Sequence, residues 1–146
     1  MKFNTNFRIV FWAFILHTVW EFTQCVFLYD MWDWPFWEAT IWMWAAIFGD
    51  ILIVLGLWIV TTLLVPSLQF ESPGYKGYMT LLFLSFLASI FLEWTAIFLG
   101  LWQYTQAMPA ITIFNHEVGL SPILQITFLP ALSIYLASRY HPQPKS

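Results

Sequence analysis

The stretch FRIVFWAFILHTVWEFTQCVFLY, residues 7–29, decides the fold, because it is long, apolar and interrupted by few charges. A helix needs about 20 mainly apolar residues to cross the hydrocarbon core of a bilayer. Twelve residues of this stretch are Leu, Ile, Val or Phe. We therefore predict that it forms a membrane-spanning helix.

The remainder of the chain has the same character. Of the 146 residues, 60% are hydrophobic and only 9% are charged, whereas a soluble domain has about a quarter charged residues. The net charge of -3 and the lack of a basic patch argue against nucleic acid as a partner. We expect one all-α integral membrane domain over residues 1–146, a four-helix bundle in the lipid bilayer. Its predicted spans cover residues 7–29, 39–64, 78–102 and 121–139.

Charges outside the spans predict the orientation of the bundle. All five basic residues lie near the termini or between the second and third spans: Lys2, Arg8, Lys76, Arg139 and Lys145. The other two connections contain acids and no base: Asp30, Asp33, Glu38 and Glu117. Because basic residues favour the cytoplasmic side of a membrane, we expect both termini to be cytoplasmic.

The first span contains polar side chains on one helical stripe. His17, Glu21 and Gln24 are four and three residues apart, which places them on the same face. The apolar residues of the span contribute about 4–7 kcal/mol to insertion, and one central carboxylate costs about 2.5–3.5 kcal/mol. The margin is small if this face contacts lipid. We therefore expect it to face the other helices or a wet cavity.

The other spans contain matching acids and amides beside small residues, which allow helices to approach closely. In the second span Asp50 lies beside a face of small residues: Ala45, Gly49 and Gly56. In the third span Glu93 lies within such a face: Ser85, Ser89, Ala96 and Gly100. In the fourth span Gln125 follows Ser121 and Pro122, which predict a helix N-cap and first turn.

These polar residues are expected at one depth. With a rise of 1.5 Å per residue, Glu21, Asp50 and Glu93 lie about 12, 18 and 13 Å from the outer ends of their spans. Four ionisable residues from three helices, including His17, then occupy one layer. We predict that they converge in a chamber that opens toward the outer face of the membrane.

Acid–base chemistry is the function that this layer favours, since ionisable residues inside a membrane are functional by default. We expect Glu21, Asp50 and Glu93 to be catalytic, with His17 as the proton partner of Glu21. The substrate is expected to be a hydrophobic small molecule, isoprenoid-like or lipid-like, and an enzyme here would be an isomerase or cyclase. The residues expected to bind it are Trp20, Gln24, Trp94 and Gln125. An apolar lining is expected from Trp12, Phe14, Trp20, Trp42 and Trp94.

Other interpretations remain open. We expect no cofactor, and the alternative is a metal ion bound by His17, Glu21, Asp50 and Glu93. The layer is also compatible with a proton-coupled transporter or channel for small solutes, although no inverted repeat is visible. In an accessory subunit of a membrane complex, or a homo-oligomer, it would serve for docking. A purely structural role is weaker, because hydrogen bonds between helices average only about 0.6 kcal/mol in membranes.

An ordered set of short motifs runs along the chain: His17-x-x-Trp20-Glu21-x-x-Gln24, Gly49-Asp50, Glu93-Trp94, Trp102-x-Tyr104, Met108-Pro109 and Gly119-Leu-Ser-Pro122-x-x-Gln125. The set resembles a family of small, uncharacterised bacterial inner-membrane proteins over nearly the whole chain. This resemblance implies a four-helix protein of the bacterial inner membrane and no particular activity. That family has a Cys or His shortly before its Gly-Asp pair, where this chain has Ile47 and Phe48, and the departure weakens the metal alternative.

A looser likeness connects Trp20-Glu21 and Asp50 with the small membrane-bound terpene cyclases, in which a helix contains a Trp-Glu pair and a distant acid supplies a proton. The connection over residues 103–120 is a separate question. Its apolar run, residues 111–114 interrupted by Thr112, is too short to span a bilayer. We expect this segment to follow the membrane surface, with a lid over the chamber as the alternative.

Overall fold

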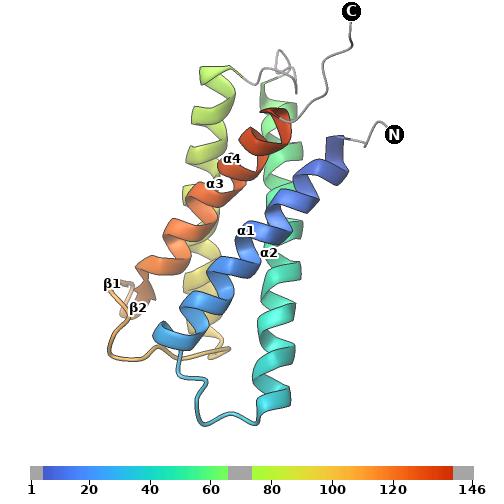
Figure 1. The fold of residues 1–146 in the computed structure, drawn as a ribbon. Coiled ribbons are helices and arrows are strands. Elements are labelled where there is room, and N and C mark those ends of the chain that lie inside the picture. The colour runs from blue at the N-terminus through green and yellow to red at the C-terminus, as the bar shows by residue number, and fades with distance from the viewer. Residues whose placement is uncertain (1–4, 66–73, 140–146) are drawn as a thin grey trace, which may run out of the picture.

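The computed structural model describes residues 5–65 and 74–139, and four long helices dominate them (Figure 1). The helices are α1 Thr5–Leu28, α2 Phe36–Leu64, α3 Tyr75–Phe98 and α4 Leu120–Arg139. Each is long and apolar enough to cross a membrane. The four predicted spans are therefore confirmed as helices. Lys2, Lys145 and residues 66–73 of the predicted polar turn lie outside the described residues.

The largest difference in helix ends is in α3, which was predicted to run to residue 102 and ends at Phe98. Gly100 has a φ of +67°, a left-handed conformation that favours glycine and terminates helices. The N–H of Leu101 donates a hydrogen bond back to the carbonyl of Ala96 at 3.0 Å. Apolar residues continue beyond Gly100, and for that reason hydropathy alone predicted a helix end that lies too far along the chain.

The helices form a ring in the order α2, α1, α4, α3. Helix α1 packs against α2 and α4, and α4 also packs extensively against α3. Contact between α2 and α3, which closes the ring, is the least extensive of the four. The ring therefore has a weakly packed side, between α2 and α3.

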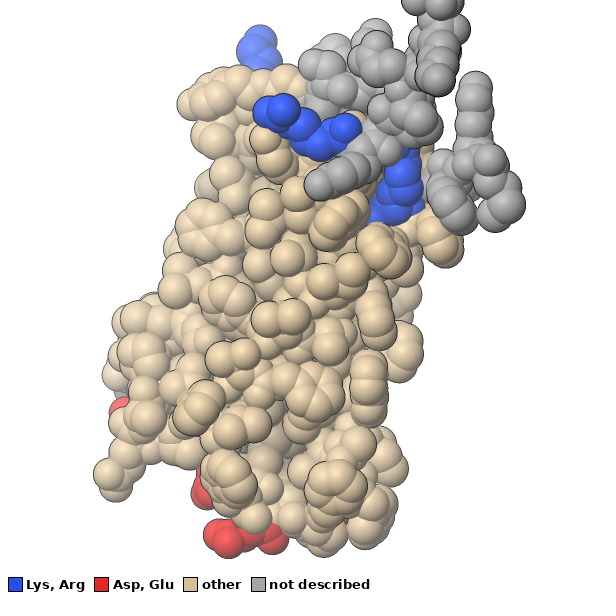
Figure 2. Space-filling model, in the orientation of Figure 1, with Lys and Arg blue, Asp and Glu red and all other residues tan. Residues whose placement is uncertain are grey.

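Charge is segregated to the two ends of the bundle. On the face shown in Figure 2, Lys and Arg gather at the end where α1 begins and α4 ends, and Asp and Glu at the opposite end. On this face the surface between them shows no charged residue (Figure 2). Many large apolar side chains are exposed on the helices, Phe48, Leu52 and Phe91 among them. This distribution suits four helices with an apolar environment around their middle.

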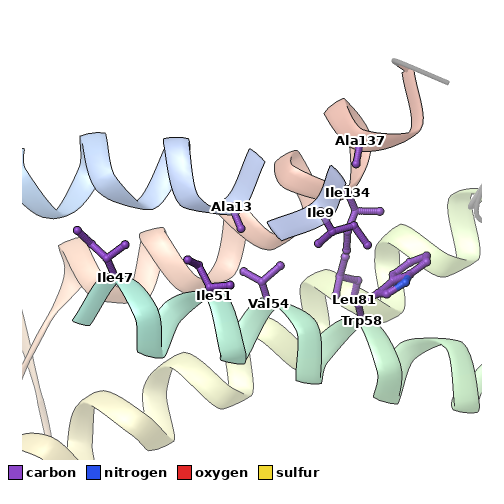
Figure 3. Packing of buried hydrophobic residues seen from close by; sticks show 9 residues of the cluster. All are labelled: Ile9, Ala13, Ile47, Ile51, Val54, Trp58, Leu81, Ile134 and Ala137. Atoms are coloured by element: carbon purple, nitrogen blue, oxygen red, sulfur yellow. The ribbon is translucent and has the colours of Figure 1, made fainter. Parts of the chain in front are cut away.

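An apolar cluster fills the bundle in the half that contains the two chain ends. Ile9, Trp58, Leu81 and Ile134 each come from a different helix and meet there (Figure 3). On α1 the buried face continues from Ile9 into the polar stripe of the first span. One continuous helix face thus serves an apolar half and a polar half of the molecule.

The face of small residues predicted on α2 is wrong as a packing surface. Gly56 and Ala45 are exposed, and the buried face instead contains larger residues, the apolar Ile47, Ile51, Val54 and Trp58 together with Thr61. Side-chain burial on α2 is set by the apolar cluster, which needs volume rather than close backbone approach. On α3 the predicted face is confirmed for Ser85, Ser89, Glu93 and Ala96, all of which are buried. It is wrong for Gly100, which is exposed and lies beyond the end of α3.

The connection between α3 and α4 contains a β-hairpin that the sequence analysis missed. Strands β1 Ala110–Ile113 and β2 His116–Gly119 pair antiparallel, with Ile111 opposite Val118. Phe114 and Asn115 both have positive φ, 46° and 64°, as a two-residue type I′ turn requires. The sequence does contain a pattern that indicates a hairpin: two short segments of strand length separated by two residues, one of them Asn.

Candidate functional site

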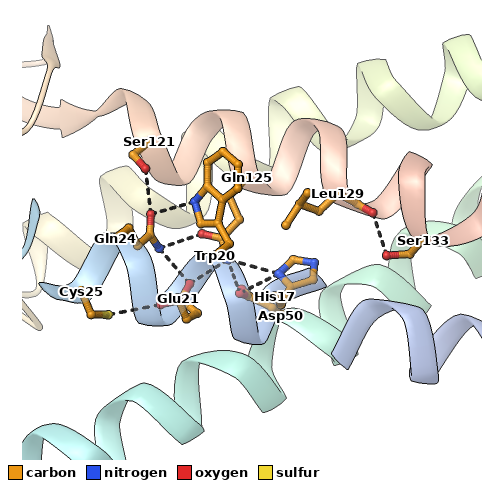
Figure 4. A network of polar contacts seen from close by, with 10 residues as sticks. All are labelled: His17, Trp20, Glu21, Gln24, Cys25, Asp50, Ser121, Gln125, Leu129 and Ser133. Atoms are coloured by element: carbon orange, nitrogen blue, oxygen red, sulfur yellow. Dashed lines mark hydrogen bonds and ion pairs between the residues drawn. The ribbon is translucent and has the colours of Figure 1, made fainter. Parts of the chain in front are cut away.

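Two glutamines from different helices meet at the centre of a polar network (Figure 4). On α1, the Gln24 amide donates hydrogen bonds to Glu21 Oε1 and to Gln125 Oε1, both at 2.8 Å. On α4, the Gln125 amide donates to Glu21 Oε1 at 2.7 Å and to Asp50 Oδ2 at 2.6 Å. One amide nitrogen therefore bridges carboxyl groups from α1 and α2.

His17 belongs to the same network and is fully buried. Its Nδ1 lies 2.9 Å from Asp50 Oδ2, so the imidazole pairs with the acid of α2. The expectation that His17 pairs with Glu21 is therefore wrong. The two share a face of α1, but the imidazole reaches across to α2, where Asp50 is available. The other ring nitrogen, Nε2, has no hydrogen-bond partner in the part of the chain that the structure describes.

The orientation of Gln24 is held by two further donors. Trp20 Nε1 donates to Gln24 Oε1 at 3.0 Å, and Ser121 Oγ donates to the same oxygen at 2.9 Å. Ser121 was expected to cap the fourth helix, and this expectation is wrong because α4 already begins at Leu120. Its hydroxyl instead joins α4 to α1. Every polar atom of the Gln24 amide is thus occupied, which fixes which way the amide faces.

Glu93 has separate partners in the connection that follows α3. Tyr104 donates its hydroxyl to Glu93, and Trp102 Nε1 donates at 3.2 Å. The N–H of Gly119 in β2 donates to the Tyr104 oxygen at 3.0 Å. Burial and the adjacent Glu93 carboxylate raise the pKa of Tyr104 well above its usual value. The hydroxyl therefore remains a proton donor to Glu93.

A cavity of about 390 Å³ lies beside this network, within the size range of ligand pockets. Glu21, Asp50 and Glu93 all line it, together with Gln24 and Gln125. The rest of the lining is mainly apolar. The three acids therefore reach one cavity from three helices, although Glu93 makes no hydrogen bond to the other two. His17 stands behind Asp50 and is not part of the lining.

The aromatic lining is largely different from the one expected. Of the five predicted aromatic residues only Trp42 lines the cavity. Trp20 acts through Gln24, and Trp94 Nε1 donates to the carbonyl of Ile113 at 3.2 Å, where it anchors the hairpin. Two other aromatic residues take their place in the wall, Tyr29 and Trp102. The pattern Trp102-x-Tyr104 was visible in the sequence, but nothing local showed that it folds under α1.

The segment after α3 crosses the end of α1 and closes the cavity on the side of the acidic end. The Asp30 N–H donates to the carbonyl of Gln103, and the Thr105 N–H donates to the carbonyl of Leu28, both at 3.0 Å. Tyr29, Met43 and Trp102 pack together there and line the cavity. The expected opening toward this end is therefore occupied by side chains. From this segment only Leu101 and Trp102 line the cavity, whereas residues 103–120 do not line it and most of them are exposed. That residues 103–120 follow the membrane surface stays a prediction.

The alternative metal site is not assembled in this structure. Among the described residues, no three or more His, Cys, Asp and Glu side chains form a group that could hold a metal ion. The Gln125 amide nitrogen lies between Glu21 and Asp50, and Glu93 is bonded to Trp102 and Tyr104. Glu93 is therefore held apart from the other three predicted ligands, and an amide nitrogen stands between Glu21 and Asp50.

Comparison of the chain with protein-family models, curated proteins and solved structures gives no match in any of the three. The resemblance of the ordered motifs to a family of bacterial inner-membrane proteins therefore stays a prediction. Any function assigned to the chain rests on the geometry of the cavity and its polar network.

Proposed function

We propose that the chain is a multi-pass protein of the bacterial inner membrane. The basic end of the bundle, where α1 begins and α4 ends, would face the cytoplasm, and both termini would lie on that side. The support is the segregation of charge. Arg8, Lys76 and Arg139 lie at the end where α1 and α3 begin and α4 ends, and acidic residues lie at the other. Basic residues are retained on the cytoplasmic side during insertion. In this orientation the cavity lies in the outer half of the membrane.

The cavity is proposed to be an acid–base site for a hydrophobic, lipid-like substrate. One observation carries this proposal: Glu21 and Asp50, from two helices, contact the same amide nitrogen at the wall of a mainly apolar cavity. Two negative charges at this separation repel strongly in an apolar medium, so a single proton held between them is the favoured arrangement. A pair that holds one proton contains both an acid and a base.

The surroundings suggest which member has which role. Asp50 Oδ2 lies 2.9 Å from His17 Nδ1, and an imidazole can share the proton that Asp50 removes, so Asp50 is assigned the role of the base. Both amides donate to Oε1 of Glu21, which leaves Oε2 available to hold a proton, so Glu21 is assigned the role of the proton donor. In an isomerase or cyclase reaction, Glu21 would protonate the substrate at one carbon and Asp50 would remove a proton from another, so that atoms and charge balance. Gln24 and Gln125 would keep both carboxyl groups in register.

The test is a conversion assay. The protein in lipid nanodiscs is incubated with a bacterial lipid extract, and the products are compared by mass spectrometry with those of Glu21→Gln. The new amide oxygen can still accept from Gln24 and Gln125, so the variant is expected to fold. We expect loss of conversion by at least roughly a hundredfold.

Glu117→Gln is the matched control, since Glu117 is an exposed acid of β2. It is expected to convert the extract as the native chain does. An unchanged product profile for Glu21→Gln would contradict the acid–base role. Substrate movement across liposome membranes that follows a pH gradient, without conversion, would favour the transporter alternative instead.

A further inference from the structure

Among the cavity-lining residues that belong to the four helices, the exposed ones all lie on one side of the helix ring. The lining residues from α1 and α4 are all buried, for instance Cys25 and Ile126. The lining residues from α2 and α3 include exposed side chains: Trp42 is 38% exposed and Leu92 is 40% exposed. This is also the side where neighbouring helices pack least. The cavity therefore communicates with the surroundings of the bundle between α2 and α3.

Gly49 keeps space free inside this opening. It lines the cavity from α2, and a Cβ added there would meet no heavy atom within 4 Å. A residue without a side chain is therefore not needed for helix packing at this position. Its effect is to leave the path from the helix surface to Asp50, the next residue, unobstructed.

The electrostatic character of the lining selects among ligands. The described residues that line the cavity include three acids, Glu21, Asp50 and Glu93, and no Lys, Arg or His. An anionic end group would meet like charge with no base to compensate it, which is costly in an apolar medium. A cation would be compensated by the acids and could also lie against the ring faces of Trp42 and Trp102.

We propose that the cavity receives a lipid-soluble amine, which enters sideways from the bilayer between α2 and α3. The protonated amino group would lie among Glu21, Asp50 and Glu93, and the apolar body would extend toward Trp42 and Leu92. This inference rests on the proposed function for the idea that the cavity holds a substrate. It adds the class of molecule and the route, and it disfavours phosphorylated lipids as ligands.

The test compares three photoreactive probes with the same alkyl chain and diazirine, which end in a primary amine, an alcohol or a phosphate. Each is added to the native chain in phosphatidylcholine nanodiscs at neutral pH, and labelled peptides are mapped by mass spectrometry. We expect the amine to label the cavity-lining parts of α2 and α3 roughly tenfold more than the phosphate. Equal or stronger labelling by the phosphate probe would overturn the proposal.

Two variants locate the route. Gly49→Phe fills the opening, and we expect it to lower cavity labelling by the amine roughly tenfold. Gly56→Phe is the matched control on the same helix, because it also has no neighbour within 4 Å but is exposed and does not line the cavity. It should be labelled in the cavity as the native chain is. Equal loss in both variants, or in neither, would overturn lateral entry at this position.

A third variant tests the charge. Glu93→Gln keeps an oxygen that can accept from Tyr104 and Trp102, but it removes one negative charge from the cavity. We expect weaker labelling by the amine and no loss with the alcohol. Failure of this proposal is separable from failure of the proposed function. Conversion that needs Glu21 but acts on an anionic lipid would overturn only the amine, whereas amine labelling without any conversion would overturn only the chemistry.

Discussion

The two halves of this bundle use the same four helices in opposite ways. In the half that contains the chain ends, Ile9, Val54 and Ile134 fill the interior with apolar side chains. In the other half the interior contains polar side chains, Glu21, Asp50 and Gln125, and a cavity lies beside them. Lipid is as apolar as these side chains, so helix association depends on close packing and on hydrogen bonds between helices. One half supplies the packing, and this leaves the other free to hold a polar site.

The largest expected effect is a loss of stability when a carboxylate is placed in the apolar half of the bundle. Val54 is completely buried and lies one helical turn after Asp50 on α2. In Val54→Asp a carboxylate would have no amide or imidazole to meet it, and we expect a cost of about 3 kcal/mol or more. The measurement is the yield of monodisperse protein after extraction and its resistance to unfolding in mixed micelles.

Asp50→Asn is the matched substitution in the polar half. The new amide can still accept from His17 and Gln125 through its oxygen, so we expect a folded protein that has lost its proposed base. If Val54→Asp were as stable as Asp50→Asn, the division of the bundle into a packing half and a site half would be wrong.

A smaller effect is expected in the segment that follows α3, beside the cavity. Tyr104→Phe removes the hydroxyl that joins Glu93 to the Gly119 N–H. We expect the free energy of unfolding to decrease by about 1–2 kcal/mol. The raised pKa of Tyr104 adds a pH dependence. The unfolded chain releases this proton near pH 10, about the ordinary tyrosine value, while the folded chain still holds it. Stability from this group is therefore complete below pH 10 and decreases as the pH rises above it.

Unfolding of the native chain and of Tyr104→Phe, followed between neutral and alkaline pH, checks this expectation. The free energy of unfolding of the native chain should decrease more steeply above pH 10 than that of the variant. Parallel curves for the two proteins would show that Tyr104 does not hold its proton in the folded state.

The smallest expected effect is at the tip of the hairpin. Phe114 is 85% exposed and has a φ of 46°, which costs a residue with a side chain about 1 kcal/mol relative to glycine. Phe114→Gly should therefore slow hydrogen exchange of the β1 and β2 amides. Asn115→Gly is the control. It should slow this exchange less, since Asn tolerates a positive φ better than other residues with a side chain. Slower exchange in the apolar half as well would mean that the two halves are coupled.

Local patterns predicted much of this structure. Apolar length gave the four helices, and the spacing of His17, Glu21 and Gln24 correctly indicated a buried stripe. The same reasoning failed at Ser121 and Trp94, whose partners come from segments far away in the chain. It also failed on α2, where small residues suggested close packing and the larger Ile47 and Val54 are buried instead. A residue's type shows that it needs a partner, but not which one it finds.

From the amino-acid sequence alone it follows that the chain makes four apolar helices and that each of α1, α3 and α4 buries a polar group, because helix length and periodicity are local properties. Only the tertiary structure decided that Gln125 bridges Glu21 and Asp50, that Glu93 turns to Tyr104, and that the cavity opens between α2 and α3. These contacts depend on how each helix is rotated and tilted against its neighbours. That geometry is set by packing among all four helices at once.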